Sequence, residues 1–245
     1  MYKARVASML FGLATFPALA ASPTASSKGE IACRNMPAKP IPAEIMTDSF
    51  FQAHPDMRWR SVALGEYKKG NYVQAMRDFK RAASYADKFS QSMVAHMYWE
   101  GLGVPVDRPL AYAWMDLAAE REYHNFAAQR EIYWAQLNEQ QQSEAVERGK
   151  PVYADYSDSV AKPKMERQLQ QAVQNITGSR TGFVSAGLYV SDIHGNMIPG
   201  SIYYNKTYYQ PEQYWCDQDA YWSRPMNPSV EVGLPDTLPP EPGEP

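Results

Sequence analysis

The sequence predicts a mainly α-helical protein, in which a short right-handed solenoid of helical pairs precedes a small β or α+β appendage. Three observations predict this arrangement. An apolar period typical of helices runs through residues 56–162. Within this region the chain resembles itself at offsets of 31 and 36 residues. Beyond residue 163, aromatic side chains gather in short alternating stretches that are typical of strands.

Composition narrows the class of protein before any motif is considered. The chain has 245 residues, of which 44% are hydrophobic and 21% charged, so it can bury a core. Its formal net charge is −3, which excludes the strongly basic surface typical of nucleic-acid binding. We therefore expect a globular protein with no nucleic-acid partner.

The N-terminus is predicted to be a secretory signal over residues 1–21. Lys3 and Arg5 precede an apolar stretch, and the small residues Ala18 and Ala20 form a pattern typical of a cleavage site. A membrane anchor is the alternative, but the apolar stretch of about 14 residues is shorter than the roughly 20 that span a bilayer. We expect a secreted or periplasmic protein with no membrane span in the mature chain.

The only two cysteines, Cys33 and Cys216, both lie in the part that would be exported. An oxidising compartment favours one disulfide between them, and two free thiols are the alternative. Their spacing fits neither a zinc site nor a redox pair. No metal and no cofactor are therefore predicted.

Composition divides the exported part into four segments. Residues 22–55 are rich in proline, alanine and serine, which indicates a linker with at most a short turn. Residues 56–162 are the helical-repeat domain, and residues 163–233 are an aromatic-rich region that begins with a short helix. Residues 234–245 are acidic and proline-rich, a composition typical of disorder.

Two helical pairs can be aligned within the repeat domain. Tyr67 corresponds to Tyr98 at the offset of 31, and alanines correspond at the offset of 36. The difference of five residues is a longer turn, GLGVPVD, in the second pair. The corresponding alanines are Ala75 and Ala111, Ala82 and Ala118, and Ala83 and Ala119.

The turn GLGVPVD leads into an apolar helix that must be covered on two sides. Gly101 and Gly103 permit the chain reversal, Asp107 can cap the first amides of the helix, and Pro109 suits its first turn. A helix with two apolar faces is expected in the inner layer of a stack. A third, divergent pair is predicted to follow, with Asn138 as the cap of its second helix.

The second pair resembles the Sel-one-like repeat, a relative of the tetratricopeptide repeat. That family shows a tyrosine, a turn of the form G-x-G-V-x-x-D, an alanine, a tryptophan-aromatic pair and a double alanine. The corresponding residues are Tyr98, Gly101, Gly103, Val104, Asp107, Ala111, Trp114, Ala118 and Ala119. The resemblance covers about 100 residues and weakens in the first pair, where Asp78 stands in place of the tryptophan.

The resemblance implies a non-catalytic scaffold of a bacterial-type cell envelope, whose stacked helices hold a protein partner in a concave groove. In such solenoids the first helix of each pair lines the groove. The partner-binding residues implied on this basis are Glu66, Lys68, Lys69, His96, Trp99 and Glu100. For each of them, an ordinary solvated surface position is the alternative.

Catalytic motifs are missing from the sequence. It has no GxSxG elbow, no HExxH and no phosphate-binding glycine loop. Asp192 and His194 in SDIHGN are explained by a turn between two strands. Asp217 and Asp219 are explained by solvent-facing carboxylates in a strand-like stretch rather than by a metal site. We expect a binding protein that is not an enzyme.

The aromatic-rich region admits a second hypothesis. The alternation in GFVSAGLYVS and SIYYNKTYY predicts two strands joined by a turn at Gly195 and Asn196. Exposed rings could bind a cell-wall glycan by stacking, and Trp215 and Trp222 are the candidate residues. The alternative is that these rings form a core and pack against the helices.

Overall fold

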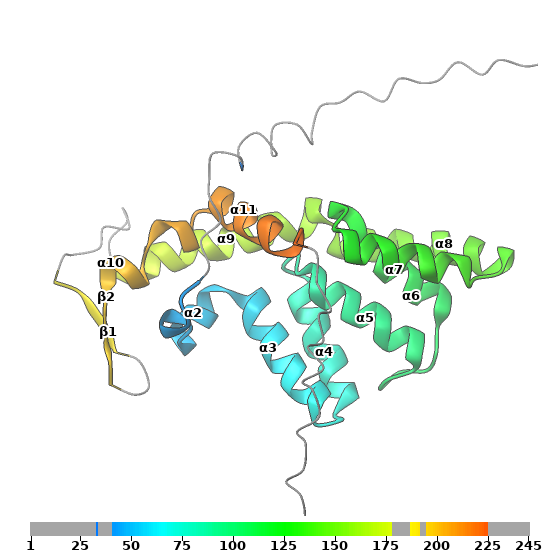
Figure 1. Ribbon diagram of the computed structural model, residues 1–245, viewed down its shortest axis with the longest axis horizontal. Coiled ribbons are helices and arrows are strands. Elements are labelled where there is room, and N and C mark those ends of the chain that lie inside the picture. Colours follow the sequence, from blue (N-terminus) through cyan, green and yellow to red (C-terminus); the bar gives the residue numbers. More distant parts are fainter. Residues whose placement is uncertain (1–32, 34–40, 178–186, 192–194, 225–245) are drawn as a thin grey trace, which may run out of the picture. The chain divides into compact units, whose positions relative to one another are not determined.

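The structure, a computed structural model, describes residue 33 and residues 41–177, 187–191 and 195–224 (Figure 1). The chain divides into two units, Met1–Met36 and Pro37–Pro245, and the elements described below belong to the second. This unit is mainly helical, as predicted. The predicted signal, the predicted acidic tail and the first part of the predicted linker lie outside the described residues.

Three pairs of helices follow one another along residues 55–156. Short turns join the two helices of each pair. The packed pairs are α3 with α4, α4 with α5 and α5 with α6, and α6 packs against both α7 and α8. The pairs are α3 (Pro55–Lys68) with α4 (Tyr72–Ala83), α5 (Lys88–Glu100) with α6 (Arg108–Ala118), and α7 (His124–Ala135) with α8 (Glu139–Tyr156).

The turn between α5 and α6 has the backbone conformation that its glycines predict. Gly101 ends α5 with φ 73° and Gly103 has φ 71°, both in the left-handed region that favours glycine. A Cβ atom on Gly103 would lie 2.6 Å from the carbonyl carbon of Tyr72, so the turn also packs tightly against α4. Asp107 then caps α6, because its side chain accepts a hydrogen bond from the N–H of Leu110 at 3.2 Å.

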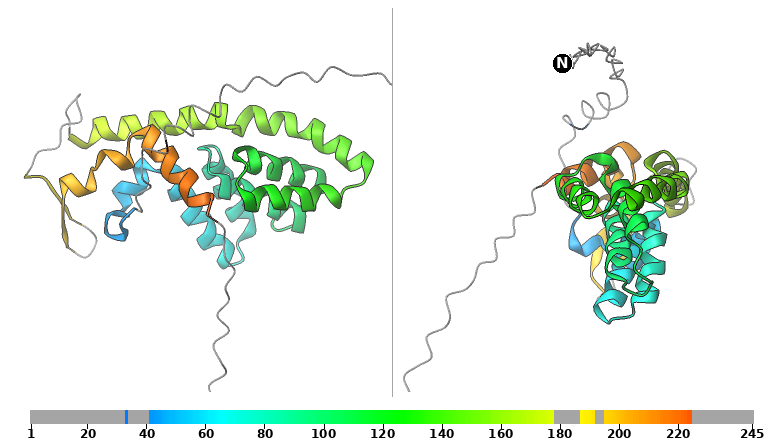
Figure 2. Two further views of the ribbon diagram at one scale, coloured as in Figure 1. Left: turned by 45° about the horizontal axis from the view of Figure 1, so that its top comes forward. Right: turned by 90° about the vertical axis from the view of Figure 1, so that its right-hand side faces the viewer.

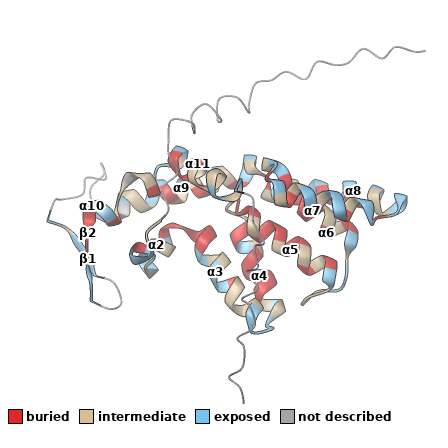
Figure 3. Cartoon of the chain, viewed as in Figure 1, coloured by how far each residue is buried: buried red, intermediate tan, exposed pale blue. Residues whose placement is uncertain are grey.

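The main core lies between the helices of these pairs, where alanines allow close approach. α6 is buried on two faces, with Ala111 and Ala118 on one and Ala113 and Leu117 on the other. Trp114, between them, is only 3% exposed. In Figure 3, buried residues also follow the sides of α4 and α5 that meet neighbouring helices. The prediction that the apolar helix is an inner layer is confirmed.

Two long helices, α8 and α9 (Asp158–Thr177), follow each other along one side of the pairs (Figure 2). Asn138 begins α8 as predicted: its side chain accepts a hydrogen bond from the N–H of Gln141 at 2.9 Å, and the Gln141 side chain accepts one from the N–H of Asn138 at 3.1 Å. α9 continues through residue 162, where the sequence analysis ended the repeat domain. Met165 and Leu169 are fully buried, so an apolar stripe holds this helix in place.

The predicted linker must be corrected over residues 41–55. A 3₁₀ turn, η1 (Ala43–Ile45), and a short helix, α2 (Asp48–Ala53), occupy this stretch. Ile45 and Phe50 are fully buried and pack with Tyr203 and Tyr209 of the C-terminal region. Because these partners lie far along the chain, no local apolar period marks the segment as structured.

The C-terminal region contains a hairpin but is otherwise helical. β1 (Tyr189–Ser191) pairs antiparallel with β2 (Met197–Pro199), and Gly195 lies between them with φ 82°, which agrees with the predicted turn. The strand predicted over 201–209 is wrong, because residues there form α10 (Gly200–Tyr203) and a 3₁₀ turn, η3 (Lys206–Tyr208). The rings of Tyr203 and Tyr208 pack in a core with Phe50 instead of on a sheet. α11 (Pro211–Trp222) follows and carries Asp217 and Asp219, which the sequence analysis placed in a strand-like stretch.

Three further findings bear on where the protein could act. Cys33 and Cys216 are disulfide-bonded, as predicted. No helix among the described residues is both long and apolar enough to cross a membrane. The described part of the chain also holds no cluster of histidine, cysteine or acidic side chains able to bind a metal ion.

Candidate functional site

The first helices of the three pairs, α3, α5 and α7, are linked by contacts between rings. The hydroxyl of Tyr67 on α3 is hydrogen-bonded to Nε2 of His96 on α5, at 3.2 Å. One turn further along α5, the indole of Trp99 stacks on the ring of Tyr133 from α7, with centroids 3.9 Å apart and planes 9° from parallel. The contacts form a row of rings that crosses all three pairs.

Beside this row lies an open groove of about 470 Å³ between α5 and α7, called here the α5–α7 groove. Side chains three or four residues apart share one face of a helix, so one face of α5 and one face of α7 supply most of the groove lining. Carboxamides, aromatic rings and one carboxylate therefore converge from two successive pairs. The lining includes His96, Trp99 and Glu100 from α5 and Asn125, Gln129 and Tyr133 from α7.

The carboxylate of Glu100 influences tyrosines on both neighbouring helices. Burial, and after it the charge of Glu100, raises the pKa of Tyr133 to about 12. Burial, Tyr72 and Glu100 together raise the pKa of Tyr67. Both phenols are therefore neutral near pH 7 and can donate a hydrogen bond. The guanidinium of Arg108 lies over the Trp99 ring, 5.1 Å from its centroid.

Of the six predicted partner-binding residues, the structure brings three to the groove. His96, Trp99 and Glu100 line it, although Trp99 is only 9% exposed and offers an edge rather than a free face. The other three, Glu66, Lys68 and Lys69, lie at the end of α3 and are not part of its lining. The carboxylate of Glu66 accepts hydrogen bonds from Lys69 Nζ at 2.9 Å and from the Asn71 side chain at 2.7 Å, so this group is tied to its own turn.

The sequence analysis did not identify the residues that α7 contributes. Asn125, Gln129 and Tyr133 follow one another at intervals of four, which places them on one face of the helix. That spacing was available in the sequence. It became meaningful only when the Trp99 contact showed which face of α7 meets α5.

The chain matches no known family model, and no curated protein or solved structure shows significant similarity to it. The likeness to Sel-one-like repeats therefore depends on the signature residues alone. The structure gives several of them concrete roles: Gly101 and Gly103 have positive φ, Asp107 is a helix cap, and Trp114 is a core residue.

α11 covers the first turns of α5 and α7, next to the α5–α7 groove. The indole of Trp222 stacks on Phe89 in the first turn of α5, with centroids 5.6 Å apart, and lies 5.9 Å from the ring of Phe126 in the first turn of α7. Arg60 of α3 lies over the same indole at 5.7 Å. The first turns of α5 and α7 are thus occupied by the chain itself, whereas their later turns form the open groove.

The two candidate glycan-stacking residues both make intramolecular contacts. Nε1 of Trp215 donates a hydrogen bond to Glu166 at 2.8 Å, and the cations of Arg121 and Lys162 lie over its ring at 4.9 and 5.1 Å. Trp222 packs against two phenylalanines, as described above. These contacts correspond to the alternative in which the rings pack against the helices.

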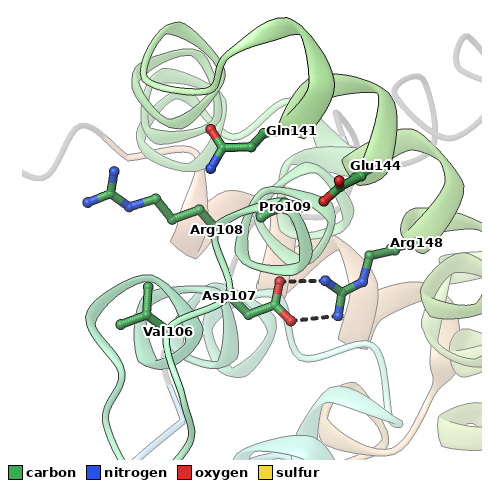
Figure 4. A pocket seen from close by; sticks show the side chains of 7 residues that line it. All are labelled: Val106, Asp107, Arg108, Pro109, Gln141, Glu144 and Arg148. Atoms are coloured by element: carbon green, nitrogen blue, oxygen red, sulfur yellow. Dashed lines mark hydrogen bonds and ion pairs between the residues drawn. The ribbon is translucent and has the colours of Figure 1, made fainter.

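A second hollow, of about 550 Å³, lies where the α5–α6 turn meets α8 (Figure 4). Arg148 of α8 binds both carboxylate oxygens of Asp107, at 2.7 and 2.5 Å. Figure 4 shows Arg108 directed away from this ion pair. The carboxylate of Asp107 thus both caps α6 and pairs with Arg148. We therefore assign this hollow a structural role.

Two deeply buried ionisable groups lie away from the α5–α7 groove. The ammonium group of Lys88 is buried and binds the carbonyl of Leu117 at 3.0 Å and the carboxylate of Glu120 at 2.7 Å. His54 is fully buried, and its two ring nitrogens lie 2.8 and 2.9 Å from the backbone carbonyls of Phe50 and Tyr208. These groups join elements of the fold, while the groove offers amide and aromatic contacts suited to binding.

Proposed function

We propose that the protein is a non-catalytic scaffold that binds an extended segment of a partner protein in the α5–α7 groove. The observation that carries this proposal is the convergence of carboxamides and rings from two successive helical pairs on one open face. Carboxamide groups can donate to peptide carbonyls and accept from peptide N–H groups at the same time. The rings of Trp99 and Tyr133 beside them are buried and stacked on each other, so they contribute edges rather than free faces.

The dimensions of the groove suit a short polypeptide. α7 has 12 residues, and at about 1.5 Å per residue it is roughly 18 Å long. An extended chain rises by about 3.3 Å per residue, so the groove can accommodate some five or six residues. An interface of this size is small, and we expect micromolar rather than nanomolar affinity.

The cellular setting and the architecture belong to the same proposal. The disulfide between Cys33 and Cys216 supports an oxidising compartment, as expected for a secreted or periplasmic protein of a bacterial-type cell envelope. The signature residues of the second pair support a right-handed solenoid of the Sel-one-like type. A protein in this setting with such a groove would hold a partner in place without performing chemistry on it.

Selection from a displayed library of random peptides tests the proposal. Peptides retained by the full chain should bind with micromolar dissociation constants. They should lose at least about tenfold in affinity on the variant Gln129→Trp, whose larger side chain fills the groove. Gln170→Trp, at an exposed position of α9, is the matched control and should bind like the original chain. Selected peptides that bind all three chains equally, or a selection that yields none, would refute the proposed function.

A further inference from the structure

We propose that the α5–α7 groove selects a partner segment that carries a lysine or arginine side chain, and that Glu100 determines this specificity. The cationic group of that side chain donates hydrogen bonds to the Glu100 carboxylate and to the hydroxyl oxygen of Tyr133, where α5 and α7 end. This inference rests on the proposed function of the groove and adds to it the charge of the partner.

The first argument is the unpaired charge of Glu100. Its side chain lines the groove, is exposed, and forms neither an ion pair nor a hydrogen bond with the described residues. Among the described residues that line the groove, it is the only carboxylate, and none is a lysine or an arginine. The carboxylate of Glu66, near the end of α3, is held instead by Lys69 and Asn71. Glu100 therefore gives the groove a negative charge that the described chain does not neutralise.

The second argument is the hydroxyl group of Tyr133. This residue is only 4% exposed and its ring is stacked on Trp99, yet its hydroxyl makes no hydrogen bond with the described residues. The hydroxyl oxygen is not sealed in the core, so it opens on the groove that Tyr133 lines. A neutral phenol can accept a hydrogen bond from an ammonium or guanidinium group. A buried side chain thus offers the groove an acceptor that has no partner within the described chain.

The third argument is the electrostatic potential where α5 and α7 end. Glu100 is the last residue of α5, and Tyr133 lies in the last turn of α7. The stack of Trp99 on Tyr133 holds these two helix ends side by side. The carboxyl end of a helix carries a partial negative charge, and neither helix has a basic residue in its last turn. Both ends therefore add to the charge of Glu100 and favour a bound cation.

The basic side chains that the neighbouring helices carry near the groove do not line it. Arg108 of α6 lies over the Trp99 ring but lines the hollow beside α8 instead. Nε2 of His96, which does line the groove, is already hydrogen-bonded to a tyrosine hydroxyl at 3.2 Å. Arg130 of α7 lies within 4 Å of three other carboxylates, those of Asp116, Glu122 and Glu131. Glu100 thus remains available to a cation supplied by a partner.

A lysine or arginine side chain also suits the apolar part of this end of the groove. Its flexible stem can pack along the edges of Trp99 and Tyr133 while the charged head reaches Glu100. The side chains of Asn125 and Gln129 form no hydrogen bonds with the described residues, so they remain for the backbone of the bound segment. We therefore expect the basic residue at the end of the segment that lies nearest Glu100.

Reversal of the charge at Glu100 tests the specificity in the full chain. Peptides selected on the original chain should be enriched in lysine or arginine. Their affinity should fall at least about threefold on Glu100→Gln and about tenfold or more on Glu100→Lys. A selection repeated on Glu100→Lys should enrich aspartate or glutamate instead. Asp155→Lys, at an exposed carboxylate of α8, makes the same change in net charge and should select basic peptides like the original chain.

A double-mutant cycle separates this inference from the proposed function. The basic residue of a selected peptide is replaced by norleucine, and both peptides are measured on the original chain and on Glu100→Gln. The norleucine peptide should bind the two chains equally, because the coupling requires both charges. Peptides that lose binding on Gln129→Trp but show no preference for basic residues, or no coupling to Glu100, would overturn the inference and leave the proposed function standing. A selection that yields no peptide on any of these chains would refute the function and the inference together.

Discussion

The carboxylate of Asp107 makes two contacts that hold the second helical pair against the third. It accepts a hydrogen bond from the N–H of Leu110 at the start of α6 and forms a two-point ion pair with Arg148 of α8. The cap is a local contact, which the sequence pattern predicts. The ion pair joins residues 41 positions apart, and only the structure reveals it.

Two substitutions at Asp107 should separate the contribution of the helix cap to stability from that of the ion pair. Asp107→Ala loses both, and we expect the free energy of unfolding to fall by about 1 to 2 kcal/mol, mostly from the lost cap. Asp107→Asn retains a capping oxygen and loses only the charge. It should cost less than about 1 kcal/mol, because Arg148 is substantially exposed and water screens the pair. Urea denaturation followed by circular dichroism measures both values, and equal losses in the two variants would contradict this division.

Gly103 is expected to be far less tolerant of a side chain than another glycine of the same domain. Alanine at this position must adopt φ near 71° and place its Cβ within 3 Å of the backbone of α4, so we expect a loss of at least about 2 kcal/mol. Gly65, within α3, has no atom within 4 Å of the position its Cβ would take. Gly65→Ala should therefore raise stability by about 0.5 to 1 kcal/mol. Thermal unfolding of the two variants tests this contrast, and a tolerated Gly103→Ala would show that the turn does not pack on α4 as described.

At the scale of elements, α9 is attached to the helical pairs by charge as well as by apolar packing. Asp158 in its first turn accepts hydrogen bonds from Arg121 at 2.7 and 3.0 Å and lies 3.1 Å from the buried ammonium of Lys88. Burial alone would raise the pKa of Asp158. The hydrogen bonds and charge of Arg121, with Lys88 and Lys162, outweigh burial and hold this pKa well below its usual range.

This attachment should make stability sensitive to acid. Because the folded-state pKa of Asp158 is depressed, its contribution is fully present above about pH 4 and is lost as pH falls through the folded value. Asp158→Asn should therefore be less stable at pH 7 by about 2 to 4 kcal/mol, and this difference should shrink between pH 4 and pH 2. Urea unfolding across this pH range measures it, with the exposed Asp155→Asn of α8 as control. A difference that stays constant down to pH 2 would contradict the role assigned to Asp158.

The success of sequence-based prediction varied from element to element for a physical reason. α6 was predicted with its glycine turn, its cap and its inner position, because each of these depends on residues close together in sequence. α2 was missed, because Phe50 is buried by tyrosines from the other end of the chain. Residues 201–209 were predicted as a strand because aromatic residues favour strands, but their rings are buried from α10 and η3.

At the scale of the whole described unit, the C-terminal region returns to the beginning of the repeat. The hydroxyl of Tyr214 on α11 donates a hydrogen bond to Asp56 at the start of α3, and Tyr123 donates one to Asp219. Together with the stacking of Trp222 on Phe89, these contacts cover the early turns of α3, α5 and α7 and leave the later turns of α5 and α7 open. Sequence reasoning located half of the candidate site, the α5 residues. It could not predict where the open groove ends, because Trp222 of α11 covers the first turns of α5 and α7 through contacts with Phe89 and Phe126, which lie far from it in sequence.

Hydrogen–deuterium exchange of the full chain, with and without a library-selected peptide, shows which surface the peptide binds. If the α5–α7 groove is the binding surface, the peptide should slow exchange in residues 92–100 and 125–136 and leave the β1–β2 hairpin and α9 unchanged. Slower exchange confined to α9 and α11, or to the turn beside Asp107, while the peptide is bound would contradict the account.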